Sequence, residues 1–154
     1  MCFKLWTNSF RGGDTEDTAI VLLKFENGSL GTLSVSDTII SPWSWELTSK
    51  ENSIYPNQKQ NCYWIGGTHG SMELPQSKIW KSTEKRSWWE PLTHTNNKVD
   101  ETKNHPLNEQ LDNFLAFIEK KQEPVCSGLD GLNTLAVIEA IKLAAKRGAA
   151  VKPE

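Results

Sequence analysis

The chain has 154 residues, of which 37% are hydrophobic and 23% charged, and its formal net charge at pH 7 is -2. This length suits a single domain with one core and is too short for two full domains. So small a net charge leaves no basic surface of the kind that nucleic acids or anionic membranes attract, so neither is an expected partner. No stretch approaches the roughly 20 apolar residues of a membrane span, and the first residues lack the apolar run of a signal peptide. A cytoplasmic location is therefore the expectation.

In the first two thirds of the chain, the sequence pattern predicts a series of short strands. Residues 2–6 (CFKLW), 18–25 (TAIVLLKF) and 29–37 (SLGTLSVSD) come first, and Asn27-Gly28 predicts a tight hairpin turn before the third run. Further strands are predicted at WSWELTS (43–49), NCYWIGG (61–67), SMEL (71–74), SKIWKS (77–82) and RSWWE (86–90). Parallel strands would need helical crossovers, and none is predicted between these runs, so the pattern indicates an antiparallel meander.

A polar connector and two helices are predicted after the strands. Residues 90–104 (EPLTHTNNKVDETKN) have the composition of a loop, and residues 105–121 then place apolar side chains on one helical face. These are Leu107, Leu111, Phe114, Leu115 and Ile118, with Pro106 suited to the first turn. A second helix is predicted from the capping-box-like start at Ser127 to a C-cap at Gly148.

This order of elements predicts an α+β fold, an open-faced and mainly antiparallel β-sheet with the two C-terminal helices packed on one face. Two helices cover only one side of such a sheet, so the other side is expected to be open. Apolar and aromatic groups on an open face would indicate self-association or a ligand site. Trp64, Trp80 and either Trp88 or Trp89 suit the open face or the core equally well, because periodicity alone does not separate the two.

The sequence shows no constellation typical of catalysis. The nearest approach to the dinucleotide fingerprint G-x-G-x-x-G is IGGTHG at residues 65–70, which has Ile65 in place of the first glycine. His69 is interpreted as part of a tight turn, His94 as a solvated connector residue, and His105 as a capping or packing residue at a helix start. Glu51 and the pair Glu16-Asp17 have no visible acid or base partner. No catalytic or cofactor-binding residue is therefore predicted.

No metal site is predicted either. The cysteines Cys2, Cys62 and Cys126 are about sixty residues apart with no Cys-x-x-Cys motif, and the three histidines are not spaced to complete a zinc site with them. Idle or buried thiols are the simpler interpretation.

Six segments, taken in order, resemble a known family. They are DTAIVLLKFENGSLGTLSVSDT, SPWSWELTSKENSIYP, GTHGSMELP, RSWWEPL, HPLNEQLDNFLAFIE and SGLDGLNTLAVIEAIKLAAKRGAAV. The ordered series resembles the C-terminal domain of the Gfo/Idh/MocA oxidoreductases, the family of glucose-fructose oxidoreductase and inositol dehydrogenase. The resemblance covers nearly the whole chain from about Glu16 and implies that residues 1–154 form one such domain.

The resemblance also implies what this chain lacks. Family members carry an N-terminal Rossmann domain that binds NAD(P), with a Glu-Lys-Pro segment and a helix bearing Asp and His, and all of these would lie upstream of Met1. The EKR at residues 84–86 is no substitute, because it lies among the strands and has no proline. The expected function is the substrate-binding and oligomerisation portion of an NAD(P)-dependent sugar or polyol oxidoreductase, not catalytic alone. A homo-oligomer through the open sheet face and a separate Rossmann-domain partner are the expected assemblies.

Residues 41–56 (SPWSWELTSKENSIYP) mix tryptophans with small polar residues. In the family this loop lies near the substrate-side and interface surface, which makes five of its residues candidates for a sugar or polyol pocket: Trp43, Trp45, Glu51, Asn52 and Tyr55. Aromatic rings stack on the apolar faces of sugars, while amide and carboxylate groups bind hydroxyls. Core packing and a subunit interface are the alternatives for the rings. For the whole chain, the alternatives are a stand-alone carbohydrate- or protein-binding module and a nonfunctional truncated remnant.

Overall fold

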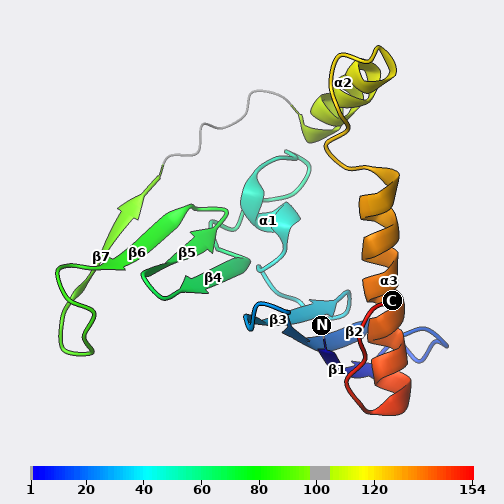
Figure 1. Ribbon diagram of the computed structural model, residues 1–154, viewed down its shortest axis with the longest axis horizontal. Coiled ribbons are helices and arrows are strands. Elements are labelled where there is room, and N and C mark those ends of the chain that lie inside the picture. Colours follow the sequence, from blue (N-terminus) through cyan, green and yellow to red (C-terminus); the bar gives the residue numbers. More distant parts are fainter. Residues whose placement is uncertain (1, 98–104) are drawn as a thin grey trace. The chain divides into compact units, whose positions relative to one another are not determined.

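The computed structural model describes residues 2–97 and 105–154, with side chains described from residue 9 onward. Two compact units are present, one formed by Met1–Ile40 with Glu123–Glu154 and the other by Ser41–Gln122 (Figure 1). Each unit contains one sheet, with strand order β1-β2-β3 in the first and β4-β5-β6-β7 in the second, and all the pairings are antiparallel. The predicted α+β class with antiparallel strands and C-terminal helices is confirmed, and the division of the strands between two sheets was not predicted.

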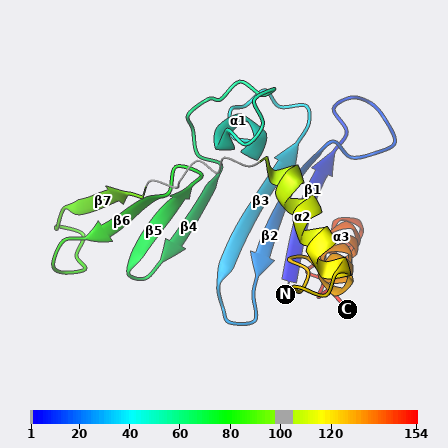
Figure 2. The same cartoon turned by 90° about the horizontal axis from the view of Figure 1, so that it is seen from above.

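The first unit packs a long helix against a three-stranded sheet. Its strands are β1 (Cys2–Asn8), β2 (Thr18–Lys24) and β3 (Leu30–Ser36), and its helix is α3 (Gly128–Arg147). Figure 2 shows α3 alongside this sheet, where it contacts β1. The buried core consists of Val21 from β2 with Ala140 and Ala144 from α3. Because alanine side chains are small, the helix backbone approaches the strands closely.

Within the first unit, none of the residues that the structure describes covers the opposite face of this sheet. Side chains alternate along a strand, so Ile20 and Leu22 point away from the face that carries Val21. Ile20 is 48% exposed and Leu22 is 42% exposed, and Leu30 on β3 shares their face. The predicted open, partly apolar face is therefore present in this unit.

The Asn27-Gly28 turn joins β2 to β3 as predicted. Gly28 has φ 86°, a left-handed conformation that glycine adopts without steric cost. The amide of Phe25 donates to the carbonyl of Ser29 at 2.9 Å and closes the turn. The Asn27 side chain accepts hydrogen bonds from the backbone and the hydroxyl of Ser29. The turn therefore fixes the register of the hairpin by local interactions alone.

The second unit contains a four-stranded sheet and two helices. Its strands are β4 (Tyr63–Gly67), β5 (Gly70–Leu74), β6 (Lys78–Ser82) and β7 (Leu92–Asn96), and its helices are α1 (Trp45–Ser49) and α2 (Pro106–Ile118). His69 lies in the β4–β5 turn as predicted, beside the hydroxyl of Thr68.

Two strand predictions in this unit are wrong. WSWELTS forms the short helix α1 instead of a strand, because Ser44 caps it by accepting from the amide of Leu47, and the buried hydroxyl of Thr48 donates to the carbonyl of Ser44. RSWWE is also not a strand: Trp88 and Trp89 lie in the loop between β6 and β7, 99% and 93% exposed.

The strand that pairs with β6 lies in the segment predicted to be a polar connector. This strand, β7, carries two β-branched threonines, Thr93 and Thr95, which suit a half-exposed strand despite the polar composition. The remainder of the predicted connector, residues 98–104, lies outside the described residues.

The two C-terminal helices form as predicted. α2 begins at Pro106, and the His105 ring accepts from the amide of Leu107 at 3.3 Å, which confirms the capping role. None of the residues that the structure describes in α2 is buried. Ser127 caps the start of α3 through a reciprocal capping box with Asp130, and Gly148, which has φ 60°, is its C-cap. Local capping signals therefore define both ends of α3.

The capping box makes the stability of α3 depend on pH. Hydrogen bonds from the hydroxyl and then the backbone amide of Ser127 lower the pKa of Asp130 below its ordinary value of 3.8, against a smaller opposing effect of desolvation. Because the folded-state pKa of Asp130 is lowered, its contribution to the free energy of unfolding is fully present above pH 3.8, the ordinary value. This contribution is lost as the pH falls through the folded-state pKa. We expect Asp130→Asn to lower the urea midpoint at pH 7 and to differ less from wild type at pH 3.

The matched control is Asp112→Asn, an exposed carboxylate within α2. Ser127→Ala removes the cap itself and should cost about 1 kcal/mol at pH 7. A difference between Asp130→Asn and wild type that stays constant from pH 7 to pH 3 would contradict the assigned role of the carboxylate.

Candidate functional site

The loop around α1 brings two of the five predicted substrate residues together. The indole Nε1 of Trp45 donates to Oε2 of Glu51 at 2.7 Å, and the Trp45 ring lies 5.7 Å from the ring of Tyr63 on β4. Glu51, which showed no partner in the sequence, therefore has one. Between these two residues the chain turns at Lys50, the C-cap of α1, which has a left-handed backbone with φ 64°. Trp45 thus links the loop to the edge of the four-stranded sheet.

The other three candidates lie separately along the loop. Asn52 forms a turn, in which its side chain accepts from the amide of Ile54 at 3.0 Å and its carbonyl accepts from the amide of Tyr55 at 3.2 Å. The Trp43 and Tyr55 side chains point outward, 60% and 44% exposed. Exposed rings on a loop held by its own hydrogen bonds suit a partner or ligand, and a substrate role for all five residues stays a prediction.

One face of the four-stranded sheet carries a connected polar and aromatic cluster. Glu73 on β5 accepts from the indole Nε1 of Trp80 at 2.6 Å and from the side-chain Nδ2 of Asn61 at 2.7 Å. The ammonium of Lys78 lies 4.1 Å from the centroid of the Trp80 ring. His94, predicted to be a solvated connector residue, is exposed but lies on strand β7, and its ring is 4.8 Å from the Trp80 ring.

A cavity of about 380 Å³ opens on this cluster. It is lined by Trp64, Ile65, Gly66, Ser71, Met72, Glu73, Trp80 and Leu92. None of the five loop candidates lines it. Two tryptophans, Trp64 and Trp80, are the only signals of this cavity that we identified in the sequence, and the face they share depends on strand register, which the structure supplies.

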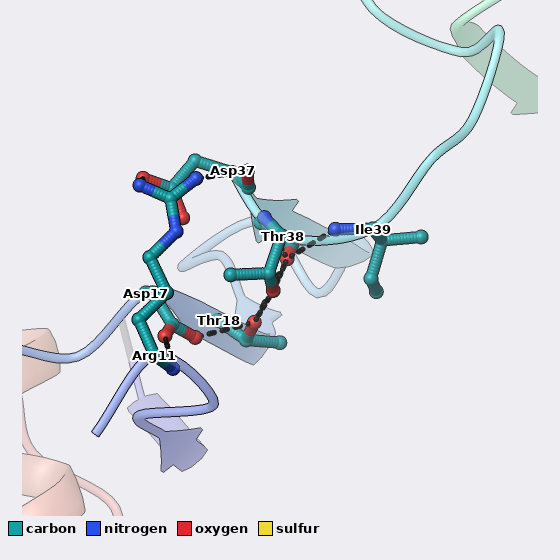
Figure 3. Close-up of polar contacts among 7 residues, drawn as sticks. Arg11, Asp17, Thr18, Asp37, Thr38 and Ile39 are labelled. Atoms are coloured by element: carbon teal, nitrogen blue, oxygen red, sulfur yellow. Dashed lines mark hydrogen bonds and ion pairs between the residues drawn. The ribbon is translucent and has the colours of Figure 1, made fainter.

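A second polar network lies at the ends of β2 and β3 in the first unit (Figure 3). The Arg11 guanidinium donates to the Asp37 carbonyl at 2.7 Å and pairs with its carboxylate at 3.3 Å. The Arg11 amide donates to Asp17 at 2.9 Å, and the Thr18 hydroxyl donates to the same carboxylate at 3.0 Å. Thr18 also lies 3.2 Å from the Thr38 hydroxyl.

Desolvation and hydrogen bonds act in opposite directions on the pKa of Asp17. Desolvation raises the pKa of this carboxyl, but donation from the backbone of Arg11, the Thr18 hydroxyl and the backbone of Phe10 outweighs it, with a further lowering by the Arg11 charge. The pKa of Asp17 therefore lies below its ordinary value. These contacts hold the loop before β2 against the end of β3, so the role of the network is structural.

No metal site is present among the described residues, where no three ligating side chains of the His, Cys, Asp or Glu type gather. The Cys62 sulfur accepts from the Thr48 hydroxyl at 3.4 Å and is half-buried, whereas Cys126 is exposed. The Cys2 thiol lies outside the described side chains. In the part of the chain that the structure describes, every helix is too short or too polar to cross a membrane.

Comparisons with known proteins give one family match. Residues 2–152 match the family described as "Oxidoreductase family, C-terminal alpha/beta domain", the Gfo/Idh/MocA C-terminal family. No curated protein matches the chain.

Two solved structures share the fold. An NAD-binding protein from Listeria innocua has a TM-score of 0.66 at 16% identity, over 97% of this chain and 40% of that one. An oxidoreductase from Agrobacterium radiobacter, in complex with NAD+, L-tartaric acid and magnesium, has a TM-score of 0.60 at 18% identity, over 98% of this chain and 42% of that one. The chain thus spans less than half the length of either protein.

Proposed function

Because the chain belongs to the Gfo/Idh/MocA oxidoreductase family, whose C-terminal domain matches residues 2–152, we propose that it is the substrate-binding and oligomerisation portion of an NAD(P)-dependent sugar or polyol oxidoreductase. The observation that carries the proposal is this match over nearly the whole chain, together with coverage of only 40% and 42% of two similar solved chains. The first is described as an NAD-binding protein, and the second was solved in complex with NAD+. The remaining length of such a protein would hold the nucleotide-binding domain.

In this proposal NAD(P) is held by a Rossmann domain, on the same polypeptide or on a separate partner, and this chain supplies the substrate side. The sequence contains no G-x-G-x-x-G fingerprint for the pyrophosphate. The exposed rings of Trp43 and Tyr55 would stack on the apolar face of a sugar or polyol. The Trp45–Glu51 hydrogen bond would position the loop, and Asn52 its turn. The chain alone would then transfer no hydride.

Self-association through the uncovered face of the β1–β3 sheet is the second part of the proposal. Ile20, Leu22 and Leu30 are exposed there, 48%, 42% and 78%. Burying apolar surface is the main favourable contribution to protein association, and contiguous exposed apolar side chains are typical of an interface. We propose a homo-oligomer with this face covered, in the cytoplasm.

The proposal predicts that the isolated chain does not bind NADH. Titrating the chain with NADH and following cofactor fluorescence should give no saturable change, because the residues that hold the pyrophosphate and ribose belong to the other domain. The NAD-binding protein from Listeria innocua serves as the positive control. A saturable change with the isolated chain would overturn the assignment of the cofactor to another domain.

A stand-alone carbohydrate- or protein-binding module is the second candidate function. The outward-pointing Trp43 and Tyr55 rings favour it, because they are held on a loop whose backbone is fixed by its own turn. A module of this kind would bind its ligand with no Rossmann domain present, whereas a nonfunctional remnant would bind nothing. Titration with sugars separates the two.

A further inference from the structure

Strand β7 forms one edge of the four-stranded sheet, and its outer side has no strand partner among the described residues. The amide of Asn97 donates to the carbonyl of Ser77 on the β6 side at 3.2 Å. Bonded and non-bonded residue pairs alternate along an antiparallel ladder, so Thr95 and Thr93 make the next hydrogen bonds to β6. The amides and carbonyls of the intervening residues therefore point away from β6, and these residues are Leu92, His94 and Asn96.

The sequence of β7 lacks the features that commonly keep an edge strand from pairing. Natural edge strands are protected by charged side chains, especially lysine, by prolines or by bulges. β7 reads Leu-Thr-His-Thr-Asn, which contains no proline, lysine, arginine or acidic residue. Its pairing with β6 runs without interruption from Leu92 to Asn96, so the strand has no bulge. All five side chains are exposed, and the edge is therefore suited to accept another strand.

The opposite edge of the same sheet, β4, is less suited to pairing. It contains Gly66 and Gly67, and glycines weaken a strand because they supply no side chain for packing. The ring of Tyr63, at the start of β4, lies 5.7 Å from the Trp45 ring of the neighbouring loop. Two chains joined through β7 would therefore have no equally suitable edge left on this sheet for a third chain.

The backbone of β7 is complementary to a second copy of itself. In an antiparallel pair centred on His94, the two His94 residues lie opposite each other, and Leu92 lies opposite Asn96 of the second copy. These are the residues whose amides and carbonyls point outward, so each of them exchanges hydrogen bonds with its opposite number. A register shifted by two residues would leave outward groups at the strand ends unbonded. The centred register is also two-fold symmetric, as a closed dimer requires.

The side chains of β7 are compatible with this pairing. In the centred register Thr93 lies opposite Thr95 of the second copy, and threonine pairs across neighbouring strands are favourable. β7 contributes no lysine, arginine or acidic side chain, so no such groups of like charge meet at the seam. The lysines Lys78 and Lys81 belong to β6, one strand further from the seam.

We propose that β7 pairs with β7 of a second copy of this chain, antiparallel and centred on His94, so that two four-stranded sheets join into one continuous sheet. This interface goes beyond the proposed function, in which the oligomer forms through the face of the β1–β3 sheet in the first unit. It needs neither the cofactor nor a substrate, and it uses the backbone of one strand instead of an apolar face.

The test measures the mass of the full chain by sedimentation velocity from about 1 μM to 1 mM protein. His94→Arg and His94→Glu each place like charges opposite each other, and each should weaken self-association about fivefold or more. An equal mixture of the two variants should restore it, because opposite charges then meet. Native mass spectrometry should show one chain of each kind in the restored dimer. His69→Arg and His69→Glu, at an exposed histidine in the β4–β5 turn, are the matched controls and should associate as wild type does.

His94→Pro tests the backbone directly. It removes an outward amide without removing a hydrogen bond to β6, and it should weaken self-association, whereas His94→Ala keeps the amide and should weaken it less. Circular dichroism confirms that each variant is folded, and the charge variants decide the matter if the proline variant is not.

Leu30→Lys, at a residue that is 78% exposed on the uncovered face of the β1–β3 sheet, separates this proposal from the proposed function. Association weakened in both charge variants at His94 and restored by their mixture supports the β7 interface. Association lost in Leu30→Lys and unchanged in the His94 variants overturns it and leaves the β1–β3 face as the interface. A wild-type chain that stays monomeric at 1 mM also overturns it, whereas the NADH titration tests the assignment of the cofactor to another domain independently.

Discussion

Substituting Gly70 with alanine is expected to destabilise the four-stranded sheet by about 1–3 kcal/mol. An added Cβ at this position would lie 2.6 Å from the backbone carbonyl oxygen of Trp80. The atom it meets is backbone on the neighbouring strand, so no side-chain rotation relieves the contact, and β5 and β6 must move apart locally. Because Trp80 lines the cavity on this sheet, the same substitution should also disturb the cavity.

Gly66→Ala is the matched control, since it adds the same methyl group to the neighbouring strand where nothing lies within 4 Å. Urea unfolding followed by tryptophan fluorescence measures both variants against wild type. We expect a lower midpoint for Gly70→Ala and a midpoint close to wild type for Gly66→Ala. Equal midpoints for the two variants would show that the close approach of β5 to β6 does not constrain position 70.

The elements that could be predicted from the sequence are those specified by neighbouring residues. The Asn27-Gly28 turn needs only a residue that tolerates positive φ, and the ends of α3 need only the Ser127 hydroxyl and the glycine at 148. Such signals act over a few residues and remain valid whatever the rest of the chain does. The order of strands and helices, and with it the fold class, follows from them.

The wrong predictions concern segments whose structure depends on other parts of the chain. Residues 45–49 alternate apolar and polar side chains as a strand would, but the Ser44 cap and the buried Thr48 hydroxyl stabilise a helical turn. Residues 92–96 read as a loop, yet pairing with β6 makes them a strand. A distant hydrogen-bonding partner outweighs local composition in β-structure, because propensity in strands depends on context.

The candidate sites also differ in whether neighbouring residues or distant parts of the chain specify them. The loop around α1 is continuous in sequence, so its mixture of rings and polar groups could be recognised before the structure. The cavity on the four-stranded sheet takes its residues from several strands, and a shift of one residue in register would move Glu73 to the opposite face from Trp64. Its composition was therefore not predictable from spacing, although Trp64 and Trp80 were noted as candidates for an exposed face.

Ala144→Leu is expected to destabilise the first unit by about 1–3 kcal/mol or more. Ala144 is fully buried where α3 meets the sheet, and Val21 opposite is 1% exposed. Three extra carbon atoms cannot be placed there without moving the helix away from β1 and β2. Partly buried side chains, among them Leu23, Val137 and Ile141, pack against the buried core of this unit, so moving the helix would loosen their contacts as well.

Asn133→Leu introduces the same side chain at an exposed position of the same helix and serves as the control. Leucine has a helix propensity only slightly below that of alanine and above that of asparagine, so a loss of about 1 kcal/mol or more in Ala144→Leu must come from packing. Thermal unfolding followed by circular dichroism at 222 nm, a wavelength dominated by helix, should give a lower midpoint for Ala144→Leu alone. An unchanged midpoint would mean that the contact between α3 and the sheet is loose enough to admit a leucine. The small alanine side chains would then not determine the distance between the helix and the strands.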